Sequence, residues 1–216
     1  MQKPDTAPCA LVFDIGGVLV DWNPRYLYRS LIPGDPRSME KFFDEIDFRN
    51  WNEEMDRGRP FAEAVADRSA QFPQYAALIR AFDERWEETL GDPIEGSVRL
   101  VRRLRNAGFP LFGLTNSSSE KFKLVRKKFP FLESFEWIMI SGEFGLIKPD
   151  PRMFEVFLNR SGLKKADCLF IDDTEMNVAA AVRAGWQAIR CLSADQMTAE
   201  LEKRGIRTGH LDESNA

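Results

Sequence analysis

Residues 10–17, ALVFDIGG, decide the fold that this sequence predicts. Four apolar residues run into Asp14, and an isoleucine and two glycines follow. An apolar run stopped by an acid and glycines is typical of a buried strand that delivers a residue to its carboxyl end. The same shape recurs at 110–114 (PLFGL), 136–140 (EWIMI) and 168–171 (CLFI), and 187–192 (QAIRCL) is a plausible last strand.

Segments with helical spacing of apolar residues lie between these strands, at 95–107, 120–128, 152–161 and 175–184. Short apolar strands that alternate with helices predict an α/β fold with a doubly wound parallel sheet. Residues 24–90 break this rhythm, because they have helical periodicity but no convincing buried strand. We therefore expect a core made of residues 1–23 and 91–216, with residues 24–90 inserted as a separate helical domain.

The composition is that of an ordinary soluble globular protein. Of the 216 residues, 44% are hydrophobic and 30% are charged. No stretch approaches the roughly 20 apolar residues that span a bilayer. The net charge of −4 gives no reason to expect binding to nucleic acid or to a membrane. The first ten residues, MQKPDTAPCA, lack the pattern of a signal peptide, so a cytoplasmic location is expected. The oligomeric state cannot be inferred.

The few cysteines and histidines exclude several kinds of catalytic site. Cys9, Cys168 and Cys191 are widely spaced and form no CxxC pair, so they are expected to be reduced thiols. The single histidine, His210, lies in a polar tail. Ser-His-Asp and Cys-His enzymes and multi-histidine metal sites are therefore effectively excluded. An enzyme with this sequence must use carboxylates, lysine and hydroxyl groups, with or without a metal ion.

Acidic and polar side chains follow three of the predicted strands. Asp14, Thr115-Asn116 and Asp172-Asp173 each stand at a strand end. Ligands of doubly wound sheets bind beyond the carboxyl ends of the strands, so these residues are expected to converge. Carboxylates that gather together repel one another unless a cation lies between them. A site with only oxygen ligands favours Mg²⁺, and Asp14 is then either a ligand or a carboxylate nucleophile.

Other residues near these strand ends suit an anionic substrate. Thr115, Asn116 and Ser117 offer hydroxyl, amide and backbone N–H donors near a helix start, where phosphate oxygens can bind. Lys148 supplies a positive charge that can stabilise a developing anion.

Four motifs, taken in order, resemble those of the haloacid-dehalogenase superfamily. They are Asp14-Ile15-Gly16-Gly17-Val18, Leu114-Thr115-Asn116, Lys148-Pro149-Asp150, and Phe170-Ile171-Asp172-Asp173-Thr174 continuing through Asn177. The resemblance spans residues 10–192. It is strongest to the branch with a helical cap, which includes bacterial sugar-phosphatases similar to α-D-glucose-1-phosphate phosphatase.

The resemblance implies a magnesium-dependent phosphatase that acts on small phosphorylated metabolites, such as sugar phosphates. Asp14 would attack phosphorus and form an aspartyl-phosphate, and Lys148 would orient it. Thr115 and the amide of Asn116 would bind the phosphoryl group. Residues 24–90 would be a cap that selects the substrate.

The metal site implied by the resemblance is built from the first and fourth motifs. Mg²⁺ would be held by the carboxylate of Asp14, the backbone carbonyl of Gly16 and Asp173. Asp172 would be a further ligand or would lie just outside the ligand shell.

Gly16 departs from the motif of many phosphatases in the family, which carry a second aspartate there as general acid and base. Three alternatives stay open: a phosphatase without this acid, a metal-independent 2-haloacid dehalogenase, and a catalytically weak relative that binds a phosphometabolite. Dehalogenases generally carry serines and an asparagine in the fourth motif. Asp172 and Asp173 therefore favour a cation and, with it, phosphate.

Weaker candidates lie in and near the inserted segment. The turn 55–60 (MDRGRP) could reach the active site, with Arg57 as a substrate contact, and Asn23 or Arg25 could also meet substrate. For each of these three residues a linker or a solvated loop is the preferred interpretation. The basic run at 121–128 is interpreted as a solvated helix face. Trp51, Phe82 and Trp86 are expected to pack inside the cap.

Overall fold

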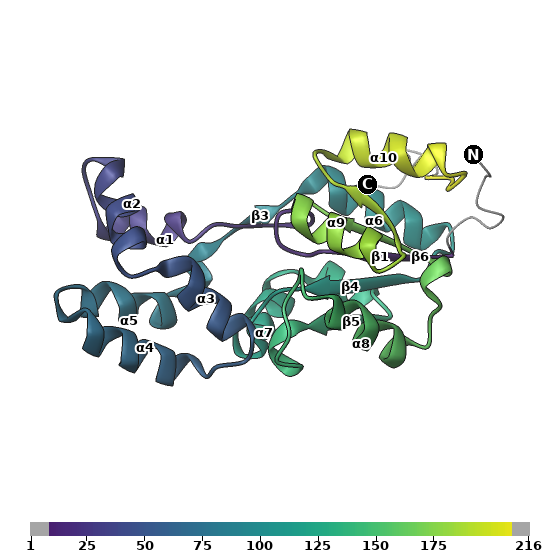
Figure 1. Ribbon diagram of the computed structural model, residues 1–216. Helices are drawn as coiled ribbons and strands as arrows, with labels where there is room; N and C mark the ends of the chain where they lie inside the picture. The colour runs from purple at the N-terminus through teal and green to yellow at the C-terminus, as the bar shows by residue number, and fades with distance from the viewer. Residues whose placement is uncertain (1–8, 209–216) are drawn as a thin grey trace.

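The computed structural model describes residues 9–208, and its centre is a five-stranded parallel sheet. The strand order is β5-β4-β1-β6-β7, and Figure 1 labels four of these strands, β1, β4, β5 and β6. The strands are β1 (Ala10–Phe13), β4 (Leu111–Thr115), β5 (Trp137–Ile140), β6 (Cys168–Asp172) and β7 (Gln187–Arg190). In register, Phe13 of β1 lies between Gly113 and Ile171, so the first and fourth motifs start from adjacent strands. The predicted α/β fold with a parallel sheet is confirmed.

Successive residues of the central strand point to opposite faces of the sheet, and each face has its own hydrophobic cluster. Ala10 and Val12 belong to one cluster, and Leu11 and Phe13 belong to the other. The first face packs against α8 (Pro151–Ser161) and α9 (Glu175–Arg183). The second packs against α6 (Glu95–Asn106), α7 (Ser119–Lys128) and α10 (Ala194–Lys203). Of these helices, only α10 was not predicted.

Five α-helices lie between β1 and α6, in the segment where a helical insertion was expected, and this segment is called the insertion below. They are α1 (Arg25–Leu31), α2 (Pro36–Glu45), α3 (Phe48–Asp56), α4 (Phe61–Gln71) and α5 (Ala76–Glu84). Aromatic rings hold them together. Phe82 packs against Phe48 and Trp51, with ring centroids 5.0 and 5.4 Å apart, and the Trp51 indole N–H donates to the Ala64 carbonyl at 3.1 Å. The predicted packing roles of Trp51 and Phe82 are confirmed.

A two-stranded antiparallel ribbon joins the insertion to the core. Its strands are β2 (Val20–Trp22) and β3 (Leu90–Pro93), and Val20 lies opposite Pro93. The sequence analysis did not anticipate this ribbon, because strands this short show little alternation. Five 3₁₀ turns complete the described chain: Pro73–Tyr75, Trp86–Thr89, Pro130–Ser134, Ser141–Glu143 and Lys165–Asp167.

The structure also bears on the cysteines and on whether any helix could span a membrane. All three cysteines are free, with Cys168 and Cys191 buried and Cys9 exposed. Among residues 9–208, no helix has the length and apolar character that crossing a bilayer requires. His210 and the polar tail lie outside the described residues.

Candidate active site

The acidic and polar residues predicted at strand ends converge at one edge of the sheet. Asp14 directly follows β1, Thr115 ends β4 and Asp172 ends β6. The backbone N–H of Asp14 donates to the Ile171 carbonyl at 2.8 Å, so the loop after β1 leaves the sheet beside β6. Because the three strands are parallel neighbours, their carboxyl ends meet there.

Lys148 lies between two carboxylates of this edge. Its Nζ is 2.8 Å from Oδ2 of Asp14 and 2.7 Å from Oδ2 of Asp172, and its side chain is almost completely buried. Burial lowers the pKa of Lys148, but the two carboxylates more than offset this, so the pKa is raised. The ammonium group therefore stays charged and fixes the orientation of Asp14.

The side chain of Asn116 holds the backbone of Lys148. Asn116 Nδ2 donates to the Lys148 carbonyl at 2.9 Å, and Asn116 Oδ1 accepts from the Lys148 N–H at 2.8 Å. This two-way clamp positions the lysine loop against the end of β4. It was missed in the sequence because the two residues are 32 positions apart.

Asp172 and Asp173 differ in how far their oxygens are already used. Asp172 is fully buried and accepts from the Thr174 N–H at 2.8 Å, from Asn177 Nδ2 at 3.0 and 3.1 Å, and from Lys148. Asp173 is only half-buried. Asp173 could therefore hold a metal ion directly, whereas the oxygens of Asp172 are engaged by Lys148, Thr174 and Asn177.

Asp14, Asp172 and Asp173 form a cluster in which one carboxylate oxygen from each lies within 4.8 Å of the others. Three carboxylates against the single ammonium of Lys148 leave two negative charges, which one divalent cation balances. Burial raises the pKa of Asp14 to about 8, with Lys148 acting in the opposite direction. A cation at the cluster would lower this pKa and keep Asp14 ionised. The donor set therefore fits Mg²⁺.

Gly17 lets the loop after β1 lie against the acidic cluster. Its φ is +73°, and a Cβ built there would lie 2.5 Å from Oδ2 of Asp173. A side chain at this position would displace the carboxylate. Gly16 is different, because a Cβ built on it has no atom within 4 Å.

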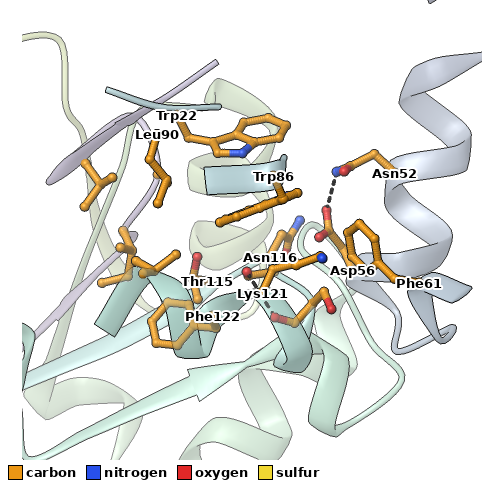
Figure 2. A pocket seen from close by; sticks show the side chains of 16 residues that line it. Trp22, Asn52, Asp56, Phe61, Trp86, Leu90, Thr115, Asn116, Lys121 and Phe122 are labelled. Atoms are coloured by element: carbon orange, nitrogen blue, oxygen red, sulfur yellow. Dashed lines mark hydrogen bonds between the residues drawn. The ribbon is translucent and has the colours of Figure 1, made fainter. Parts of the chain in front are cut away.

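A pocket opens beside this edge, between the insertion and the core (Figure 2). Its empty volume, which includes the part open to solvent, is about 560 Å³. Thr115, Asn116 and Gly16 lie on the core side. The wall is mostly apolar, and its larger side chains are Trp22, Phe61, Trp86, Leu90, Phe122 and Val125.

One interpretation of the sequence is extended at this pocket, and one is corrected. Trp86, expected to pack inside the cap, also lines the pocket (Figure 2). Lys121, expected on a solvated face, is buried, and its Nζ donates to the Asp83 carbonyl at 3.0 Å and to the Asp83 carboxylate. The insertion packs over this end of α7, which the basic run could not reveal.

The weaker candidates fall outside the pocket lining. Arg57 is exposed and pairs with Glu53 at 3.2 Å, and Arg25 pairs with Glu40 at 2.7 Å. Asn23 accepts a hydrogen bond from the Arg25 N–H.

Asp56, in the same turn as Arg57, does line the pocket, together with Asn52. The sequence signal was their i, i+4 spacing on the polar face of α3, which is also the pattern of a solvated face.

The end of α3 docks directly on the core. Ser141 Oγ donates to the Asp56 carbonyl at 2.6 Å, and Glu120 Oε1 accepts from the Phe61 N–H at 3.2 Å. Gly58, at φ +95°, lies so close that a Cβ would be 2.5 Å from the Gly142 carbonyl oxygen. These contacts hold the end of α3 and the start of α4 on the core next to the pocket.

Residues 10–185 match the family described as haloacid dehalogenase-like hydrolase. The chain belongs to this family. It is therefore a hydrolase, as the four motifs predicted. The matched range includes every residue of the acidic edge and the whole helical insertion.

Individual relatives carry out two different reactions. The chain is 27% identical to the sesquiterpene phosphatase astK of Aspergillus oryzae, over 82% of this chain and 86% of that protein. It is 23% identical to the (S)-2-haloacid dehalogenase of Pseudomonas putida, covering 82% and 81%.

A solved structure shares the fold. It is the HAD family enzyme bt-2542 of Bacteroides thetaiotaomicron in complex with magnesium and inorganic phosphate, with a TM-score of 0.66. The identity is 24%, over 85% of this chain and 93% of that one.

Proposed function

We propose that this hydrolase is a magnesium-dependent phosphatase that acts on small phosphorylated metabolites through an aspartyl-phosphate on Asp14. The observation that carries the proposal is the cluster of Asp14, Asp172 and Asp173, with Lys148 in contact with two of its members. The acids of the fourth motif favour a cation, and a cation at a nucleophilic carboxylate favours phosphate as the substrate. The phosphatase relative and the magnesium and phosphate bound in the bt-2542 structure support this assignment.

Mg²⁺ would be held by Asp14, Asp173 and the backbone carbonyl of Gly16, with Asp172 next to it. When bound, it supplies positive charge to the phosphoryl oxygens and lowers the barrier to attack by an anion. Lys148 keeps Asp14 in one orientation and adds a second positive charge near the phosphoryl oxygens. Catalysis of this kind depends mainly on positioning and electrostatics.

The residues of the chain perform two displacements. A carboxylate oxygen of Asp14 attacks phosphorus, and the bond from phosphorus to the leaving-group oxygen breaks. The Thr115 hydroxyl and the Asn116 N–H hold the phosphoryl oxygens during the transfer. Water then attacks phosphorus, and inorganic phosphate leaves as the Asp14 carboxylate is restored.

In this proposal the helical insertion acts as a cap domain. The cap comprises residues 24–90, and the rest of the chain is the catalytic core. Its side of the pocket would meet the leaving group. A sugar phosphate, which the family resemblance suggests, remains a prediction, as does a cytoplasmic location.

A second substrate class is favoured by the pocket wall. Trp22, Trp86 and Phe61 are aromatic side chains in the lining of this pocket. An apolar or aromatic leaving group would bury its surface there, at about 25 cal/mol per Å². The sesquiterpene phosphatase relative points in the same direction.

The test is phosphate release from a panel of esters with and without Mg²⁺. Glucose 1-phosphate represents sugar phosphates, farnesyl monophosphate the apolar class, and p-nitrophenyl phosphate an activated ester. Magnesium-dependent release is expected, and the ranking by kcat/KM separates the two classes. Chloride release from 2-chloropropionate without metal, and no phosphate from any ester, would instead establish the dehalogenase alternative.

A further inference from the structure

Gly16 leaves the proposed reaction without an acid at the place where related phosphatases carry one. The leaving-group oxygen of an ordinary ester needs a proton as its bond to phosphorus breaks. Gly16 lines the pocket, and a Cβ there would meet no atom within 4 Å. The proton must therefore come from water or from another side chain that faces the pocket.

Asp56 is a carboxylic acid on the opposite side of the same pocket. It is the last residue of α3, and it shares the pocket lining with Gly16 and Thr115 (Figure 2). Asn52 Nδ2 donates to its Oδ2 at 2.8 Å, and the backbone N–H of Ser118 donates to the same carboxyl group. Two donors from two different elements fix its orientation.

The contact with Ser118 places this carboxyl group near the proposed phosphoryl site. Ser118 is only two residues from Asn116, whose N–H would hold the phosphoryl group. Because successive Cα atoms are about 3.8 Å apart, the two backbone donors lie within roughly 8 Å of each other. Asp56 thus lines the same pocket as Thr115 and Asn116, into which a leaving group would extend.

The charges around Asp56 leave its proton available at neutral pH. Arg57 is paired with Glu53, and Lys121 of α7 is paired with Asp83 of α5. Glu120 of α7 bonds to the Phe61 N–H. Burial, and after it the charge of Glu53, raise the pKa of Asp56 to about 7, against the opposing effects of the Ser118 N–H and Arg57.

We propose that Asp56, supplied by the helical insertion, is the general acid and base of this enzyme. The proposal rests on the phosphatase function proposed above. As Asp14 attacks, the Asp56 proton passes to the leaving-group oxygen while the bond from phosphorus to that oxygen breaks. In the second displacement the Asp56 carboxylate takes a proton from the attacking water, so both aspartates return to their starting states.

The test compares two esters of similar shape in the wild-type enzyme and in Asp56→Asn. p-Nitrophenolate leaves without a proton, whereas the phenolate of phenyl phosphate leaves well only when protonated. The ratio kcat/KM covers only the steps through formation of the aspartyl-phosphate, so it isolates the acid step. Asp56→Asn should lower kcat/KM for phenyl phosphate about 10²- to 10⁴-fold and for p-nitrophenyl phosphate only a few-fold.

The pH profile gives a second measurement. A general acid must be protonated, so wild-type kcat/KM for phenyl phosphate should fall as the pH rises through about 7. That limb should be absent in Asp56→Asn. Glu53→Gln is the matched control, because it removes a neighbouring carboxylate that does not line the pocket. It should keep the ratio between the two esters and move the limb to lower pH.

A rescue variant separates catalysis from packing. Gly16→Asp places a carboxylate in the open space at the usual position, and in the Asp56→Asn background it should restore part of the phenyl phosphate activity. Equal losses with both esters, or no loss, would overturn the role of Asp56 while leaving the phosphatase function standing. A wild-type enzyme that releases no phosphate from either ester would overturn both.

Discussion

The acidic residues on the two sides of the pocket differ in how deeply they are buried and in how many hydrogen bonds fix them. On the core side, Asp172 is fully buried and accepts hydrogen bonds from Thr174, Asn177 and Lys148. On the insertion side, Asp56 is partly exposed, with one side-chain donor and one backbone donor. The difference suggests that the phosphoryl chemistry depends on a fixed geometry, whereas contacts to the leaving group can vary.

The most damaging change should be on the core side. Asp14→Asn removes the nucleophile, and its amide is a poor partner for Lys148. Turnover of any phosphate ester should fall on the order of 10⁴-fold or more, as for other nucleophile replacements. Phosphate release measures the loss, and circular dichroism should show an unchanged fold. Substantial turnover by this variant would show that Asp14 is not the nucleophile. It would also contradict the idea that the chemistry depends on the fixed geometry of the core side.

Metal binding tests the acidic cluster without depending on activity. Mg²⁺ at 100 times its Kd should stabilise the wild-type protein by about 2.7 kcal/mol, which is a rise in Tm of roughly 5–10 °C for a chain of this size. Asp173→Asn should abolish most of this rise. Asp44→Asn, an exposed aspartate of the insertion, is the control and should keep it. A full rise in Asp173→Asn would place the cation elsewhere.

Two glycines allow a matched comparison of the two sides. Gly17 and Gly58 both have positive φ, and at both a Cβ would lie 2.5 Å from an oxygen. At Gly17 the oxygen belongs to Asp173, so Gly17→Ala should weaken Mg²⁺ binding about 10- to 100-fold. At Gly58 it is the Gly142 carbonyl, so Gly58→Ala should disturb docking and raise KM about tenfold, equivalent to about 1.4 kcal/mol.

The controls for these glycines are Gly108 and Gly34, which have positive φ but no atom within 4 Å of a built Cβ. Alanine there adds backbone strain of about 1–3 kcal/mol without a clash. It should lower Tm and leave both Mg²⁺ affinity and KM unchanged. For each of the four variants, isothermal calorimetry measures the Mg²⁺ affinity and steady-state kinetics measures KM. If Gly58→Ala weakened Mg²⁺ as much as Gly17→Ala, the two sides would not be separable.

The smallest effect concerns a single hydroxyl group. Ser141→Ala removes the hydroxyl that donates to the Asp56 carbonyl at 2.6 Å and accepts from the Ser117 N–H at 2.8 Å. A neutral hydrogen bond contributes about 1 kcal/mol net, so we expect KM to rise about fivefold with little change in Tm. Ser134→Ala, whose hydroxyl donates only to the Phe131 carbonyl, serves as the control. A loss of kcat alone would show that Ser141 acts on the reacting groups rather than on docking.

The core and the insertion also differ in how much of their structure the sequence could predict. The strands of the core and the positions of Asp14, Thr115 and Asp172 at its edge could be predicted, because an apolar run that ends in a polar residue is typical of a strand in a parallel sheet. Their contacts in the structure follow from that topology. Roles in catalysis and metal binding remain proposals.

For the insertion, the sequence predicted only that it consists of helices. Periodicity shows which face of a helix is apolar, but it does not show what packs on the polar face. Asn52 on α3 was therefore not singled out, and Asp56 was noted only as part of the turn 55–60 that could reach the active site. Lys121 on α7 was interpreted as part of a solvated basic face. Each became a buried or pocket residue when the insertion docked on α7, a contact between residues dozens of positions apart. The ribbon of β2 and β3 was too short to show a period at all.

That ribbon has a consequence for how the protein could change over evolution. Trp22 and Leu90 are paired across it, so the chain leaves the core and returns to it at neighbouring points. Paired residues of antiparallel strands have Cα atoms about 5 Å apart, a gap that a tight turn closes. The whole segment between them could thus be shortened, exchanged or lost with no change in the order of the strands. New substrate preferences could then be acquired by replacing one module while the reacting groups keep their places.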